Sequence, residues 1–130
     1  AGSGKPTALL VGDVALLHDL TAWLTARVHG LSLTVLVVNN DGGGIFHFLP
    51  VAERTPHFEA LFGTPHGVDL SHVASLAGAK LHRPAHMAAI RTALRDGLGG
   101  GLHLIEVKTD RRANVDAHRA LFARLSEATS

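Results

Sequence analysis

The sequence contains no cysteine and no tyrosine, and it has only one tryptophan and one methionine among its 130 residues. The absence of cysteine excludes disulfide bridges and thiolate metal sites, and it makes a reducing, cytoplasmic setting the default expectation. No apolar stretch reaches the roughly 20 residues that a membrane-spanning helix requires, so we expect no membrane span. The N-terminus also lacks the charged and then apolar pattern of a signal peptide.

An excess of charge of one sign is missing as well. The formal net charge is +1, and the lysines and arginines are scattered instead of clustered, so we expect no nucleic-acid partner. Hydrophobic residues make up 46% of the chain, which excludes a disordered protein. A chain of this length buries roughly two thirds of the surface of its unfolded form. We therefore predict one domain over residues 1–130.

Short apolar runs alternate along the chain with stretches whose apolar residues have helical spacing. The apolar runs predict strands over 7–11, 33–38, 79–82 and 102–107. The helical spacing predicts helices over 14–28, 69–77, 85–98 and 115–128. The stretch 52–67 is predicted to be irregular, with one helical turn near 58–62. This alternation predicts the α/β class, a doubly wound parallel sheet with helices on both faces.

Gly12 and Asp13 follow the first predicted strand directly. Gly12 lets the backbone come close to a ligand. The predicted helix that begins at Val14 directs its free N–H groups toward the same place, which suits a phosphate group. A carboxylate beside a phosphate makes sense when a divalent cation bridges the two, and Mg²⁺ commonly binds both kinds of oxygen.

The sequence Asn-Asn-Asp-Gly-Gly-Gly, residues 39–44, follows the second predicted strand. Ligands of parallel sheets bind beyond the carboxyl ends of the strands, so Asp13 and Asn40 are expected at one sheet edge. The Asn40 amide oxygen and a backbone carbonyl, most simply that of Gly42, would complete the protein ligands. Each feature alone has a simpler explanation, because Asp often caps a helix and Asn-Asn-Asp-Gly often forms a turn. Their combination favours a cation-bridged phosphate site.

The Gly-Asp pair and the double Asn, with a strand, a helix and a strand between them, resemble the cofactor motif of thiamin-diphosphate-dependent enzymes. Four further stretches resemble one branch, the 2-succinyl-5-enolpyruvyl-6-hydroxy-3-cyclohexene-1-carboxylate synthases of menaquinone biosynthesis. They are 12–20, 39–46, 62–67 and the set of Thr109, Asp110 and Arg111 with Asn114, His118 and Arg119. Val14 stands where many members of the superfamily have a second glycine, and this branch commonly has a larger apolar residue there. The resemblance covers the C-terminal part of a much longer family polypeptide.

The resemblance implies a cofactor, thiamin diphosphate, and a metal ion, Mg²⁺ or Mn²⁺. The implied metal ligands are Asp13, Asn40 and the carbonyl of Gly42. The implied cofactor-binding residues are Gly12, Asp13, Val14, Ala15, Asn40, Gly42 and Ile45.

The resemblance also implies the substrates, 2-oxoglutarate and isochorismate. In the family, the cofactor attacks 2-oxoglutarate, CO₂ leaves, and the succinyl unit adds to isochorismate, so the cofactor carries the difficult chemistry. The implied substrate-binding residues form an apolar wall of Ile45, Phe46 and Leu49. No catalytic residue is implied in this chain, because the glutamate that activates the cofactor belongs to a separate domain of a partner subunit.

The implied partners are the pyrimidine-binding and central domains, which this chain lacks, and a second subunit in a homodimer or tetramer. Two alternatives stay open. One is another thiamin-diphosphate enzyme, such as a 2-oxo acid decarboxylase or an acetolactate synthase. The other is a non-enzymatic α/β module that binds a phosphorylated ligand or a partner chain.

Ten histidines are an unusual number for this length. His82 and His86 are four residues apart, but Pro84 lies between them and no His-Glu-x-x-His pattern is present, so we expect no histidine metal site. His47 is a candidate for the substrate pocket. His103 is expected to be exposed or half-buried.

We predict that the purified 130-residue chain does not decarboxylate 2-oxoglutarate when it is supplied with Mg²⁺ and thiamin diphosphate. The physical reason is that the resemblance places the activating glutamate outside this chain. Release of CO₂ from labelled substrate measures the activity, and detectable turnover refutes the expectation.

Overall fold

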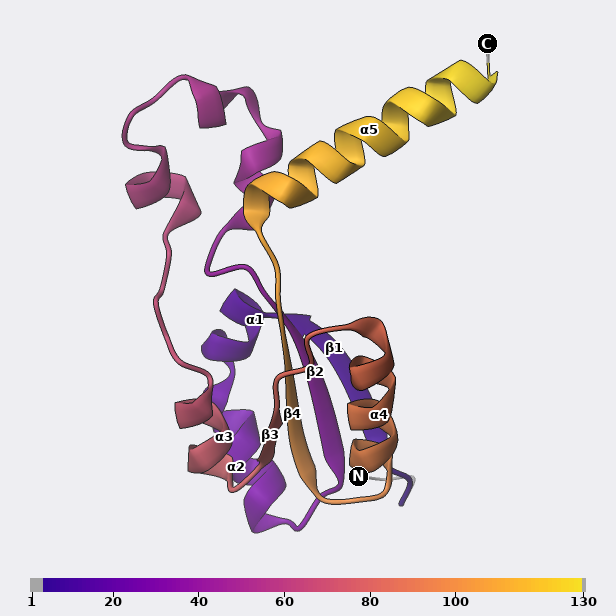
Figure 1. The fold of residues 1–130 in the computed structure, drawn as a ribbon. Coiled ribbons are helices and arrows are strands. Elements are labelled where there is room, and N and C mark those ends of the chain that lie inside the picture. The colour runs from indigo at the N-terminus through magenta and orange to yellow at the C-terminus, as the bar shows by residue number, and fades with distance from the viewer. Residues whose placement is uncertain (1–3, 130) are drawn as a thin grey trace. The chain divides into compact units, whose positions relative to one another are not determined.

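The computed structural model describes residues 4–129, and Figure 1 shows the elements that they form. These residues gather into two units by their internal contacts. The first unit comprises the chain up to Asn39 together with Gly67–Lys108. The second unit comprises Asn40–His66 and the chain from Thr109 onward. The expectation of one domain over residues 1–130 stays a prediction.

A sheet of four parallel strands, in the order β1-β2-β4-β3, is the centre of the first unit. Gly12 pairs with Val38 in register, and Asn39 pairs with Lys108, so β1, β2 and β4 end at the same edge. The four predicted strands and their parallel arrangement are confirmed. The strands are β1 (Thr7–Gly12), β2 (Leu33–Asn39), β3 (Lys80–His82) and β4 (Leu102–Lys108).

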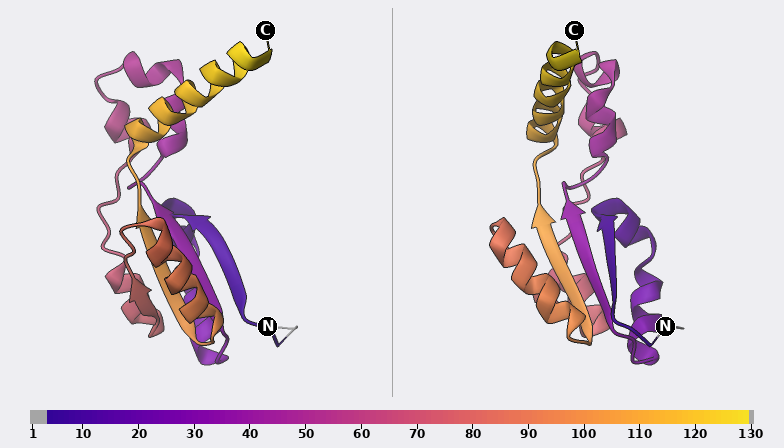
Figure 2. Two further views of the ribbon diagram at one scale, coloured as in Figure 1. Left: turned by 45° about the vertical axis from the view of Figure 1, so that its right-hand side comes forward. Right: turned by 90° about the vertical axis from the view of Figure 1, so that its right-hand side faces the viewer.

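Helices cover both faces of this sheet, as predicted (Figure 2). The first face carries α1 (Asp13–His18), α2 (Leu20–Val28) and α3 (Ser71–Ala77), and the second carries α4 (Met87–Leu98). Burial of apolar side chains on the first face supplies the main driving force for folding of this unit. The buried cluster there consists of Leu16, Trp23, Val35, Val37, Leu70, Val73, Ala74, Ala77 and Leu104.

The prediction of one helix over 14–28 is wrong, because the chain forms two helices that are separated at Asp19. The backbone of Asp19 has φ −122° and ψ 42°, outside the helical region. Its N–H donates a hydrogen bond to the carbonyl of Leu16 at 3.2 Å. The apolar spacing continues from Leu16 to Trp23 across the break, so the sequence pattern does not reveal it.

The second unit consists of short helical turns and one long helix. Its turns are η1 (Gly44–Phe48), η2 (Pro50–Glu53) and η3 (Glu59–Gly63), of which η3 confirms the predicted turn near 58–62. Its helix is α5 (Arg111–Thr129), which begins four residues before the predicted start at 115. The apolar pattern starts only at Val115, whereas the carboxylate of Asp110 accepts a hydrogen bond from the Ala113 N–H at 2.7 Å and stabilises the earlier start.

None of the helices within residues 4–129 has both the length and the apolar character that are needed to cross a membrane.

The buried hydroxyl of Thr34 leads to a prediction on the stability of the second face of the sheet. The side chain of Thr34 is buried beneath α4, and its hydroxyl oxygen has no hydrogen-bond partner within residues 4–129. We predict that Thr34→Val, which keeps the shape, raises the free energy of unfolding by about 1 kcal/mol, because it removes a buried unsatisfied hydroxyl. Urea unfolding measures this change. A lower free energy of unfolding in the variant contradicts the prediction that the Thr34 hydroxyl is unsatisfied.

Candidate functional site

The first group of predicted site residues lies where β1 meets α1. Gly12 is the N-cap residue of α1 and has an extended backbone, and Asp13 is the first helical residue. The carboxylate of Asp13 is buried, and its Oδ1 accepts a hydrogen bond from the N–H of Val14 at 2.9 Å. Val14 and Ala15 are exposed. Because α1 has only six residues, the local N–H groups of its first turn matter more here than the helix dipole.

The second group lies on the glycine-rich loop that follows β2. The N–H of Gly43 donates to the carbonyl of Gly63 at 2.7 Å, and the N–H of Gly44 donates to the carbonyl of Gly42 at 3.0 Å. Asp41 and Gly42 have positive φ values of 60° and 126°. A Cβ atom on Gly42 would collide with the backbone oxygen of Gly63. This loop therefore requires glycine at 42, and it is held by the segment that contains Gly63.

Asn40 has an unusual side-chain environment in this loop. A Cβ atom on Gly44 would collide with Asn40 Nδ2, so the amide group lies directly over the backbone of Gly44. Asn40 Oδ1 is buried and has no hydrogen-bond partner among the residues that the structure describes. An unsatisfied buried acceptor costs about 1–3 kcal/mol, and native proteins rarely keep one without a reason. An oxygen atom in this state suits a ligand to a hard cation.

The predicted apolar wall lies on the turn that follows the loop. Ile45 is 73% exposed, Phe46 38% and Leu49 49%, so all three side chains are accessible. The ring of Phe46 contacts the edge of the Phe62 ring at a centroid distance of 5.8 Å. Exposed apolar side chains that follow one another on a turn favour contact with an apolar ligand or partner surface. Their substrate-binding role stays a prediction.

The predicted site residues thus form two groups, one in each unit. Asp13 follows β1 and Asn40 follows β2, and these strands are parallel neighbours whose carboxyl ends form one sheet edge. The first group is Gly12, Asp13, Val14 and Ala15. The second group is Asn40, Gly42, Ile45, Phe46 and Leu49.

Glu106 is a residue of this region that the sequence analysis missed. Its carboxylate is almost fully buried, accepts a hydrogen bond from Asn39 Nδ2 at 2.7 Å and receives another from Arg83 Nε at 2.7 Å. It fixes the side chain of the last residue of β2, immediately before Asn40. A glutamate inside the otherwise apolar run Leu-His-Leu-Ile-Glu-Val was the available signal, because an unpaired carboxylate is rarely buried.

A second carboxylate supports the same arginine. Arg83 also donates to Oδ1 of Asp69, and the N–H of Ser71 donates to this oxygen at 2.9 Å. The hydrogen bond from the backbone of Ser71, followed by those from its hydroxyl and from Arg83, lowers the pKa of Asp69 to about 2. The stability that Asp69 contributes is therefore complete above its ordinary pKa and is lost as the pH falls through about 2.

Two histidines contact each other on the second face of the sheet. His82 Nε2 lies 3.0 Å from His103 Nδ1, and the two rings are stacked. Burial, and then the charge of His103, lowers the pKa of His82. The expectation that His103 is exposed or half-buried is wrong, because it is 7% exposed. Its inward orientation follows from strand alternation, which places it on the same face as Ile105.

Comparison with known proteins gives matches over nearly the whole chain. The family model described as thiamine pyrophosphate enzyme, C-terminal TPP binding domain, matches residues 1–107. The chain is 61% identical over 128 residues to the 2-succinyl-5-enolpyruvyl-6-hydroxy-3-cyclohexene-1-carboxylate synthase of Myxococcus xanthus, and 48% identical over 128 residues to that of Chloroflexus aurantiacus. These matches cover 97% and 98% of this chain but 22% of each relative. The chain thus spans about a fifth of the length of these relatives.

Solved structures share the fold. Benzoylformate decarboxylase from Polynucleobacter necessarius aligns with a TM-score of 0.71 at 22% identity, over 85% of this chain and 20% of that protein. The thiamine diphosphate-dependent 4-hydroxybenzoylformate decarboxylase from Rhodococcus jostii RHA1 aligns with a TM-score of 0.66 at 25% identity, over 81% of this chain and 20% of that protein. At this level of identity the likeness concerns the fold.

The contacts of Glu106 lead to a prediction on stability. We expect Glu106→Gln to lower the free energy of unfolding by about 2 kcal/mol, because the buried hydrogen bonds to Arg83 and Asn39 lose their charged acceptor. Urea unfolding measures the difference. Glu127→Gln, an equivalent change on the exposed part of α5, is the control and is expected to stay within about 0.5 kcal/mol of the parent. Equal stability of the two variants contradicts the prediction.

Proposed function

Because this chain belongs to the thiamine pyrophosphate enzymes, as their C-terminal TPP-binding domain, we propose that it is the cofactor-binding part of a synthase of menaquinone biosynthesis. The complete enzyme would decarboxylate 2-oxoglutarate and add the succinyl unit to isochorismate. Six similar proteins, between 42% and 61% identical, carry the name of this synthase. Their identity exceeds that of the two decarboxylases with solved structures, so it favours this branch over other thiamin-diphosphate enzymes.

The observation that carries the site assignment is the buried, unpartnered Oδ1 of Asn40. A divalent cation at this oxygen would remove the penalty of an unsatisfied acceptor. Asp13 would add a carboxylate oxygen, which is the usual protein ligand of Mg²⁺. Gly42 would add its carbonyl oxygen, which also accepts the hydrogen bond from the Gly44 N–H. All three ligands are oxygen atoms, as this metal requires.

The remaining residues of the site fit the other parts of the cofactor. Gly12 and Ala15 leave the backbone at the start of α1 accessible, and they would line the diphosphate together with Val14. The apolar wall would face the reacting end of the cofactor and the substrates, with Ile45 in contact with both. An accessible apolar surface of this kind would exclude water from the reacting atoms once the substrates are bound.

Thiamin diphosphate, when bound, supplies the carbanion chemistry that decarboxylation and carbon–carbon bond formation need. The part that we assign to this chain is to hold the diphosphate through the metal and to orient the reacting end against the apolar wall. The activating glutamate would come from elsewhere in the complete enzyme. The proposed partners are therefore the remaining domains of the polypeptide and a second subunit.

A chimaera offers a defined way to test the proposed function. In it, this chain replaces the matching 128-residue segment of the Myxococcus xanthus synthase. The chimaera is expected to consume isochorismate in the presence of 2-oxoglutarate, Mg²⁺ and thiamin diphosphate. A folded chimaera that decarboxylates 2-oxoglutarate but does not consume isochorismate would favour another thiamin-diphosphate enzyme.

We predict that Asp13→Asn in this chimaera abolishes the Mg²⁺-dependent binding of thiamin diphosphate, because the metal loses its carboxylate ligand. Isothermal titration calorimetry with and without Mg²⁺ measures the binding. Asp41→Asn is the matched control, since Asp41 lies between the proposed ligands Asn40 and Gly42 but its carboxylate is 3.5 Å from His66. Unchanged binding by the Asp13 variant would exclude Asp13 as a metal ligand.

A further inference from the structure

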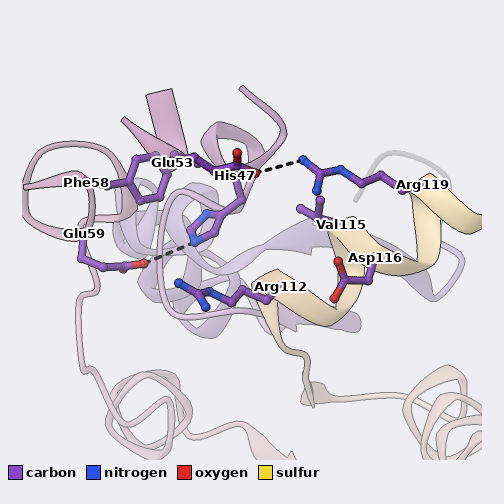
Figure 3. A pocket seen from close by; sticks show the side chains of 9 residues that line it. His47, Glu53, Phe58, Glu59, Arg112, Val115, Asp116 and Arg119 are labelled. Atoms are coloured by element: carbon purple, nitrogen blue, oxygen red, sulfur yellow. Dashed lines mark hydrogen bonds and ion pairs between the residues drawn. The ribbon is translucent and has the colours of Figure 1, made fainter. Parts of the chain in front are cut away.

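The turn that carries the apolar wall is held by a buried histidine, His47. On η1, the side chains of Ile45, Phe46 and Phe48 are exposed, whereas His47 between them is 9% exposed. His47 Nε2 lies 3.3 Å from Glu59 Oε1, and Figure 3 shows the two side chains directed toward each other. The turn therefore presents apolar side chains outward and one polar side chain inward.

Packing alone does not fix the ring of His47. This ring forms a T-shaped contact with the Phe58 ring, at a centroid distance of 4.7 Å and an interplanar angle of 88°. A cavity of about 310 Å³ adjoins the ring, with Glu59 and Arg112 also in its lining (Figure 3). Because open space lies beside the imidazole, the directional contact with Glu59 is needed to hold it in one orientation.

Glu59 connects this histidine to the start of α5. Its second oxygen, Oε2, lies 3.0 Å from Arg111 Nη2, so one carboxylate bridges two side chains from different elements. The side chain of Arg111 is only 15% exposed, while that of Glu59 is 55% exposed. Hydrogen bonds between ionised groups are shorter and stronger than neutral ones, and the planar guanidinium adds directionality.

Arg111 in turn reaches the loop with the proposed metal ligand. A Cβ atom on Gly44 would lie 3.5 Å from Arg111 Cγ and would collide with the amide of Asn40. Gly44 is therefore enclosed between these two side chains. A Cβ atom on Gly63 would lie 2.7 Å from Arg111 Nη1 and would collide with Glu59 Oε2. Glycine at 44 and 63 therefore leaves room for the side chain of Arg111 next to both backbones.

We propose that His47, Glu59 and Arg111 form a clamp that sets the position of the apolar wall relative to Asn40. The clamp residues are positioning residues, since each acts through the turn or the loop that it holds. This inference rests on the proposed function, because it concerns the site that holds the cofactor. The clamp joins the loop at residues 40–44, the turn at 44–48 and the start of α5 into one rigid arrangement.

The composition of the clamp supports a positioning role over simple stabilisation. His47 Nδ1 and Arg111 Nη1 are both buried without a hydrogen-bond partner among the described residues. Each such atom lowers the stability of the fold, and an apolar anchor of similar size would avoid this penalty. Charged groups that are partly removed from water add little to stability, but their interactions are directional. Fixing one arrangement is the best-attested use of such groups.

The test uses the chimaera with the Myxococcus xanthus synthase. Glu59→Gln and His47→Leu are expected to lower kcat about 10-fold or more, because a displacement near 1 Å at reacting groups costs up to about 100-fold. The affinity for Mg²⁺ and thiamin diphosphate is expected to change less than about 3-fold, since the ligands themselves are intact. His47→Gln, which keeps a donor for Glu59, is expected to recover most of the lost kcat.

Glu53→Gln is the matched control. Glu53 also lies in the second unit and is paired with Arg119, but the distance is 3.7 Å and both side chains are largely exposed. Such a surface pair contributes little to stability, so kcat is expected to stay within about 2-fold of the parent. Variants at 47 and 59 that unfold at lower urea concentration yet keep kcat per folded molecule would overturn the positioning role.

A measurement on the 130-residue chain separates this inference from the proposed function. Long-range ¹H–¹⁵N correlation spectra report which ring nitrogen of His47 carries the proton. We expect Nε2 to be protonated in the parent and the tautomers to mix in Glu59→Gln. Mixed tautomers already in the parent would overturn the clamp. An unsubstituted chimaera without isochorismate activity, combined with the expected spectra, would overturn the proposed function and leave the clamp in place.

Discussion

The hydrogen bond from Asn39 to the buried carboxylate of Glu106 is the interaction on which the end of β2 depends. It joins the last residue of β2 to β4 at 2.7 Å, and Arg83 supports the same carboxylate from outside the sheet. A charged hydrogen bond in the interior therefore fixes the side chain of the last residue of β2. A strand end held only by apolar packing would be less firmly fixed, since dispersion contacts have little directionality.

The two units differ in how they bury apolar and polar groups. The first unit buries a continuous apolar cluster on one face of its sheet, as a stable scaffold does. The second unit keeps apolar side chains exposed on η1 and α5, and it buries polar atoms, such as Asn40 Oδ1, that have no partner in the part of the chain that the structure describes. Such features lower stability, and proteins retain them where a ligand or another chain segment completes the structure.

The glycine-rich loop shows how a turn and a ligand site depend on the same residues. Gly43 binds the carbonyl of Gly63, and Gly44 admits both the Asn40 amide and the side chain of Arg111. The Phe-Gly-Thr segment around Gly63 is thus the physical support of the Asn-Asn-Asp-Gly-Gly-Gly loop. Two of the stretches that resemble the menaquinone branch in sequence, 39–46 and 62–67, are thus in direct contact in the structure.

The sequence by itself determined the class of fold, its four parallel strands and the candidate ligands, because apolar periodicity and the Gly-Asp and Asn-Asn signals are local. The sequence did not predict the break at Asp19, because the apolar spacing continues across it. It also did not predict the early start of α5, because the apolar pattern begins only after Arg111. Only the tertiary structure decided the roles of Glu106, His47, Glu59 and Arg111. Each acts through a partner that lies at least 12 residues away along the chain, and the hydrogen bonds that define these roles exist only when folding brings those partners together.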